Sequence, residues 1–153
     1  MTMYLPEELM RIRTSNSNSP PPPKMIELEM LHAVDDCVEY WQKGNTRVET
    51  VGDRTDVYLH NNRIVSICME TDTMLISDCG WQTSTTKSRI NCLLRQYTPC
   101  CSRIYQEKHQ WYLDYGDGDV VEMTKGANYL IHLVDCNCIY EDYDAYIDIR
   151  EVE

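Results

Sequence analysis

The segment of this sequence with the clearest potential for chemistry is residues 80–91, which read GWQTSTTKSRIN. It holds five hydroxyl side chains and two cationic ones but no acid, in a chain whose net charge is −11. Thr85 or Thr86 can cap a helix here, and a helix start presents free amides and about half a positive charge. Together with Lys87 and Arg89, these groups are typical of a site for phosphate or another anion.

A tryptophan beside this segment adds a second type of contact, because its ring can stack on a nucleobase. The sequence therefore predicts an anion or nucleic-acid site made of Trp81, Thr85, Thr86, Lys87, Arg89 and Arg95. Threonines also cap helices without any ligand, and a tryptophan at this position can pack in a core. The segment alone leaves both interpretations open.

The C-terminal residues 135–153 form the second distinctive segment, because acids alternate there with tyrosines. Carboxylates spaced along a surface can imitate phosphates, and tyrosines are favoured at interfaces. We predict a partner-binding acidic surface made of Tyr140, Glu141, Asp142, Tyr143, Asp144, Asp148 and Glu151. A solvated acidic face that keeps the protein in solution is the alternative interpretation.

Other reactive side chains fit known sites less well. The acids at 114, 117, 119 and 122 miss the spacing of a calcium loop, and cysteines 100, 101, 136 and 138 lack the usual two-residue zinc spacer. The four histidines show no spacing to a cysteine that nucleophilic catalysis would demand. Walker loops, Rossmann fingerprints and nucleophile elbows are missing from the sequence. We predict no enzymatic activity, metal or cofactor.

Composition indicates one domain with a real core, since 42% of the 153 residues are hydrophobic. Apolar runs stay well short of the roughly 18–20 residues needed to cross a bilayer. The N-terminal residues lack the pattern of a secretory signal, and the eight cysteines then suggest reduced thiols rather than disulfides. We therefore expect the protein in the cytoplasm.

The elements that must position these residues are predicted from apolar spacing and turn signals. The fold class is α+β, with an antiparallel sheet of about five or six strands packed on two main helices. We predict an arm with a Pro-rich linker at 1–23, the domain at 24–134, and the acidic segment at 135–153. The helices are predicted at 24–43 and 85–97, and the strands at 47–51, 56–60, 63–69, 73–77, 102–113, 119–123, 129–134 and 145–152.

Three stretches of the chain resemble an uncharacterised small domain family of tailed bacteriophages: NTRVETVGDRTDVYLHNNRI, LISDCGWQTSTTKSRIN and QWYLDYGDGDVVEM. The resemblance covers about residues 45–123 and centres on a Gly-Trp-x-Thr-x-Thr-Thr-Lys-x-Arg-x-Asn motif. The family usually has Gly where Asn62 stands, and Asn tolerates the same left-handed turn. The matching positions are Asn45, Thr46, Leu59, His60, Asn62, Gly80, Trp81, Thr83, Thr85, Thr86, Lys87, Arg89, Asn91, Trp111 and Tyr112.

The resemblance implies a phage origin and action in the cytoplasm of a bacterial host, but it carries no biochemical function. With the acidic composition, it leads us to predict a non-enzymatic accessory protein that inhibits a host nucleic-acid-handling or defence complex, as anti-CRISPR proteins do. The expected partner is a basic host protein or ribonucleoprotein complex, with no membrane involved. The alternatives are a nucleic-acid-binding module using residues 81–95 and a structural component of the virion.

Overall fold

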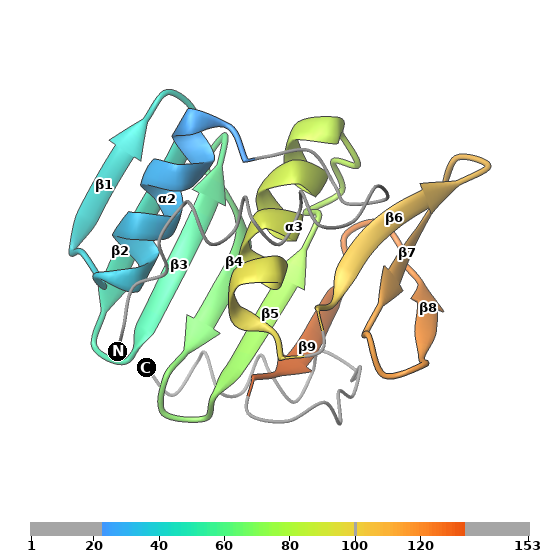
Figure 1. The fold of residues 1–153 in the computed structure, drawn as a ribbon. Coiled ribbons are helices and arrows are strands. Elements are labelled where there is room, and N and C mark those ends of the chain that lie inside the picture. The colour runs from blue at the N-terminus through green and yellow to red at the C-terminus, as the bar shows by residue number, and fades with distance from the viewer. Residues whose placement is uncertain (1–22, 100, 134–153) are drawn as a thin grey trace.

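A computed structural model describes residues 23–99 and 101–133 and confirms the predicted α+β class (Figure 1). Two helices, α2 (Met25–Asp35) and α3 (Ser84–Tyr97), cover one face of a six-stranded antiparallel sheet. A three-stranded sheet of β6 (Arg103–Glu107), β7 (Gln110–Asp114) and β8 (Val120–Glu122) stands beside α3. The larger sheet has the order β1 (Tyr40–Lys43), β2 (Thr46–Val51), β3 (Arg54–Leu59), β4 (Asn62–Cys68), β5 (Thr73–Ser77) and β9 (Asn128–His132).

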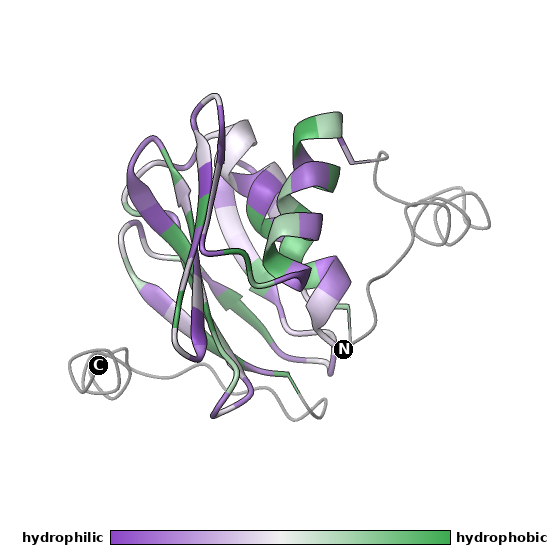
Figure 2. Cartoon of the chain, turned by 90° about the vertical axis from the view of Figure 1, so that its left-hand side faces the viewer, coloured by the Kyte–Doolittle hydropathy of each residue, from purple (hydrophilic) through white to green (hydrophobic). Residues whose placement is uncertain are grey.

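One row of buried side chains crosses the larger sheet on the face that the helices cover. Val48 pairs with Val57, Val57 with Val65, and Val65 with Ile76. Ile76 then pairs with Tyr129 of β9, and the whole row is at most 5% exposed. Burying a large aliphatic side chain contributes about 1.5–3 kcal/mol, so this row is a main source of stability. Figure 2 shows the helices on one side of this sheet.

The prediction of a helix at 24–43 is wrong for the second half of this range. The α-helix ends at Asp35, Cys37 takes a left-handed φ of 51°, and Tyr40–Lys43 forms the edge strand β1. Trp41 pairs with Val48, so its ring belongs to the sheet rather than to a helix. The apolar spacing continues past Asp35, but β-branched and aromatic residues favour a strand there.

The turn between β3 and β4 also differs from the expectation. His60 and Asn61 carry the left-handed φ values, 52° and 68°, whereas Asn62 already opens β4. Two successive left-handed residues are typical of the tight hairpin turns that match strand twist. His60 is held there by its backbone amide, which donates to the Asn45 carbonyl at 2.9 Å.

The strand predicted at 102–113 is wrong as one strand, because Lys108 and His109 take left-handed φ values of 51° and 69° and divide it into the antiparallel strands β6 and β7. The strand predicted at 119–123 is present as β8, and the inner face of this small sheet belongs to the common core. Trp111 and Leu113 of β7 are buried with Ile104 of β6 in the same cluster as the larger sheet. The helix α3 therefore lies between two sheets and must contact both. The predicted strand at 129–134 is present as β9, while the N-terminal arm, the acidic segment and the strand predicted at 145–152 lie outside the described residues.

Candidate functional site

The segment GWQTSTTKSRIN forms the turn after β5 and the first two turns of α3. Its helix cap is Thr83, not Thr85 or Thr86 as predicted. The Thr83 side-chain oxygen accepts a hydrogen bond from the Thr86 amide at 3.1 Å, and the two hydroxyls lie 2.9 Å apart. An N-cap side chain accepts a hydrogen bond from the amide two or three residues on, so Thr83 is the N-cap residue and Thr86 supplies the donor. Thr86 is buried, while Thr85 is partly exposed.

Arg89 is buried inside the fold and bonds to two other elements. Its Nη1 donates to the Glu27 carboxylate of α2 at 2.8 Å, and its Nε donates to the Thr46 hydroxyl of β2 at 3.1 Å. Glu27 also accepts hydrogen bonds from the Ser88 hydroxyl and from the Lys24 amide. Arg89 is 5% exposed and Glu27 is 2% exposed. This guanidinium therefore neutralises an internal carboxylate instead of facing an external anion.

Lys87 and Asn91 attach α3 to the three-stranded sheet. The Lys87 ammonium lies 5.7 Å from the ring centre of Trp111 and donates to the Gln106 side chain at 3.3 Å. The Asn91 amide bonds the backbone of Ile104 in both directions, donating to its carbonyl at 2.8 Å and accepting from its N–H at 2.6 Å. Lys87 thus helps to attach α3 to the three-stranded sheet.

Arg95 lies in the last turn of α3, at the opposite end from the threonines. A cation is favoured there because the helix dipole ends in unsatisfied carbonyl groups. The structure therefore divides the predicted anion site. Trp81, Thr85 and Thr86 line one cleft, whereas Lys87, Arg89 and Arg95 do not.

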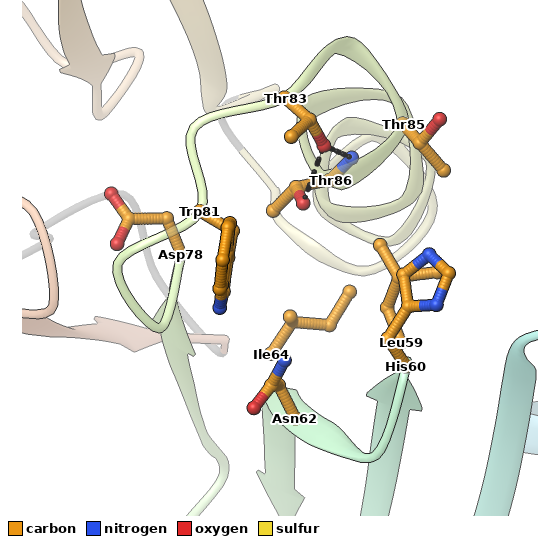
Figure 3. Close-up of a pocket in the computed structure, with 9 residues that line it drawn as sticks. All are labelled: Leu59, His60, Asn62, Ile64, Asp78, Trp81, Thr83, Thr85 and Thr86. Atoms are coloured by element: carbon orange, nitrogen blue, oxygen red, sulfur yellow. Dashed lines mark hydrogen bonds between the residues drawn. The ribbon is translucent and has the colours of Figure 1, made fainter.

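This cleft has a volume of about 500 Å³ and opens between the start of α3 and the β3–β4 turn (Figure 3). Trp81 is 63% exposed, and its indole stands on one side of the cleft with His60 on the other. An exposed indole beside aliphatic side chains suits a flat or apolar group. The cleft is lined by Leu59, His60, Asn62, Ile64, Asp78, Trp81, Thr83, Thr85 and Thr86.

Asp78 holds the loop that carries the tryptophan. Its Oδ1 accepts from the backbone N–H groups of Gly80 and Gly126 at 2.7 Å each, and its Oδ2 accepts from the Gln82 side chain at 2.9 Å. The carboxylate is buried and points away from the Trp81 ring in Figure 3. Asp78 therefore positions a wall of the cleft rather than offering its charge to a ligand.

Sequence reasoning placed none of the β3–β4 residues in this site. Leu59, His60, Asn62 and Ile64 precede Trp81 by some 20 residues, and only the antiparallel pairing of β3, β4 and β5 brings them together. The sequence signal for this part of the cleft is the His-Asn-Asn turn, in which His60 and Asn61 take left-handed φ values. Apolar alternation does not show which end of a strand borders a helix.

The acids considered for calcium binding act in turns. Asp114 accepts from the Gly116 amide at 2.8 Å, and Asp117 accepts from the Asp119 amide at 3.0 Å. Within the described residues, no group of three His, Cys, Asp or Glu side chains is placed to hold a metal ion. The same part of the chain contains no helix that is long and apolar enough to cross a membrane. The predicted partner-binding residues at 140–144, 148 and 151 lie outside the described residues.

The fold and the site define a small α+β domain in which α3 is bonded to both sheets and borders a cleft with an exposed tryptophan. The chain belongs to the Kyanoviridae Gp96 protein family, whose model matches residues 23–130. It is therefore a phage protein, as the resemblance implied, and the matched region extends from before α2 into β9. No curated protein and no solved structure matches the chain.

Proposed function

We propose that this phage protein is a non-enzymatic accessory protein that binds a basic host protein through an acidic surface and inhibits it. The observation that carries the proposal is the internal use of the basic residues at the start of α3. Arg89 neutralises the buried Glu27, and Lys87 lies against Trp111. The segment that was predicted to offer phosphate a cationic surface therefore uses these two cations in contacts within the fold.

Ion pairing of other cations in the described residues supports the same conclusion. Six basic residues of the described part form ion pairs with acids: Lys43, Arg47, Arg54, Arg63, Arg89 and Arg103. The chain as a whole keeps a net charge of −11. Such a charge repels nucleic-acid backbones and accelerates association with basic proteins.

Proteins that handle nucleic acid carry the basic surfaces that this protein fits best. An acidic protein bound to such a surface occupies the place of the phosphates and blocks the nucleic acid. A host defence complex of the CRISPR type, in the cytoplasm of the bacterial host, is the partner class we propose. The predicted acidic residues 140–151 supply carboxylates and tyrosines for this contact.

Affinity capture from host lysate tests this function. The wild-type protein as bait should retain a basic nucleic-acid-handling protein after nuclease treatment, at physiological salt. A bait with Asp142→Asn, Asp144→Asn, Asp148→Asn and Glu151→Gln should lose it, because the four substitutions remove four negative charges from one segment. Equal capture by both baits, or capture that depends on intact nucleic acid, would refute the proposal.

A nucleic-acid-binding module is the second candidate, and one observation favours it. Trp81 is 63% exposed beside Thr85 at the first turn of α3, where a base could stack and a phosphate could meet free amides. The cations that would strengthen such a site are directed elsewhere. This function therefore ranks below the acidic accessory protein.

A further inference from the structure

The three-stranded sheet presents a face that no described element covers. Ile104, Trp111 and Leu113 on its inner face are buried, whereas the alternate residues of β6, β7 and β8 point outward and are at least partly exposed. The register places these outward residues side by side. Tyr105 lies opposite Tyr112, and Tyr112 lies opposite Glu122.

Two tyrosines form the centre of this outer face. The rings of Tyr105 and Tyr112 stack with their centres 5.3 Å apart and an interplanar angle of 20°. The Arg103 guanidinium lies over Tyr105, 4.7 Å from the ring centre. The tyrosine pair therefore already holds a guanidinium at one end, and cation–π contacts of this kind contribute about 0.5–1 kcal/mol at exposed sites.

Carboxylates surround the tyrosine pair. Glu107 and Asp114 lie on the outer face of β6 and β7, and Glu122 lies beside Tyr112 on β8. Desolvation, followed by the negative charges of Glu122 and Glu107, raises the pKa of the Tyr112 hydroxyl. Among the outward residues of the three strands themselves, three acids and one cation, Arg103, leave a net negative charge.

The outer face of the larger sheet is different. Arg47 pairs with Glu49 at 2.6 Å, and Asp56 lies within 3.4 Å of both Arg54 and Arg63. Positive and negative groups alternate there and neutralise one another locally. Charge therefore distinguishes the two uncovered faces and favours the three-stranded sheet for a basic partner.

We propose that the outer face of β6–β7–β8 is a docking surface for an arginine-rich segment of a basic protein, with one partner guanidinium stacked on Tyr112 and paired with Glu122. This inference rests on the proposed function and gives it a second contact surface within the described fold. The stacked rings supply a rigid aromatic platform, and the acids hold the partner's cations around it.

Titration of the full-length protein with a deca-arginine peptide, followed by two-dimensional NMR, tests this surface. The largest shift changes are expected at residues 103–107, 110–114 and 120–122. The pair Glu107→Gln and Glu122→Gln should weaken peptide binding about 5-fold or more, a loss of roughly 1 kcal/mol. The pair Tyr105→Thr and Tyr112→Thr should do the same while keeping strand-forming residues.

The control variant carries Glu39→Gln and Glu70→Gln, which remove the same charge from exposed acids elsewhere. It should change peptide affinity by no more than about twofold, because exposed charges beyond a Debye length are screened. Equal weakening by the control, or shifts confined to residues 134–153, would overturn the docking surface. A peptide that maps to this face while lysate yields no partner would refute the proposed function alone.

Discussion

Replacing Arg89 with methionine is expected to lower the free energy of unfolding by about 3–5 kcal/mol. The substitution leaves the Glu27 carboxylate buried without its counter-charge, at 2% exposure. It also removes the donor to Thr46, which is itself fully buried. Urea denaturation followed by circular dichroism measures the change. A loss of this size is a large fraction of the free energy of unfolding of a small domain.

The double variant Glu27→Leu and Arg89→Met is the control for this prediction. Replacing both members of a buried ion pair with apolar residues of similar size is often neutral or stabilising. The double variant should therefore recover most of the lost stability. A single variant that loses less than about 1 kcal/mol would show that Arg89 is not the internal partner that the geometry indicates.

Replacing Asp78 with alanine is expected to cost about 3 kcal/mol and to release the loop that carries Trp81. The N–H groups of Gly80 and Gly126 and the Gln82 amide all lose their acceptor. Hydrogen bonds to a charged group contribute about 1.5–3 kcal/mol each, and such losses are not additive. Denaturation measures the stability, and the tryptophan fluorescence, to which the exposed Trp81 contributes beside Trp41 and Trp111, follows the loop.

Asparagine at position 78 separates the carboxylate charge from the hydrogen bonds. The Oδ1 atom that accepts from both glycines is kept, and Gln82 can turn its carbonyl toward the new amide. Asp78→Asn should therefore lose less than about 1 kcal/mol and leave the fluorescence unchanged. Equal losses for alanine and asparagine would mean that the negative charge, and not the acceptor geometry, holds this loop.

Much of the fold could be predicted from local patterns, because β3, β4 and β5 contain short runs of apolar residues and the turns between them carry strong signals. The strand β1, which replaces the second half of the predicted first helix, could not be predicted in this way. Val38 and Trp41 continue the helical spacing, and only the pairing of Trp41 with Val48 makes this segment a strand. Tertiary contacts decide such cases, since local propensities differ by only a fraction of a kcal/mol per residue.

The site was less predictable than the fold, and the reason lies in the cations. Lys87 and Arg89 sit two residues apart, so on a helix they point in different directions. Lys87 meets Trp111 of β7, and Arg89 meets Glu27 of α2, which precedes it by 62 residues. Sequence spacing shows which residues share a helix face, but it cannot show which charge from another element is buried against them.

Lys87 and Arg89 of the segment GWQTSTTKSRIN contact different parts of the fold, and this arrangement affects what the protein can bind. If Lys87 and Arg89 serve the contacts of α3, the protein should not bind nucleic acid through the start of this helix. Its negative charge then determines the partner, which we propose to be a basic host protein.

Fluorescence anisotropy with labelled single- and double-stranded DNA and RNA at low salt tests this consequence most directly. Low salt favours every phosphate contact, so it gives nucleic acid the best opportunity to bind. We expect no rise in anisotropy for the wild-type protein or for Lys87→Ala. Binding that weakens steeply with salt, and weakens again in Lys87→Ala, would show that the segment GWQTSTTKSRIN binds phosphate after all.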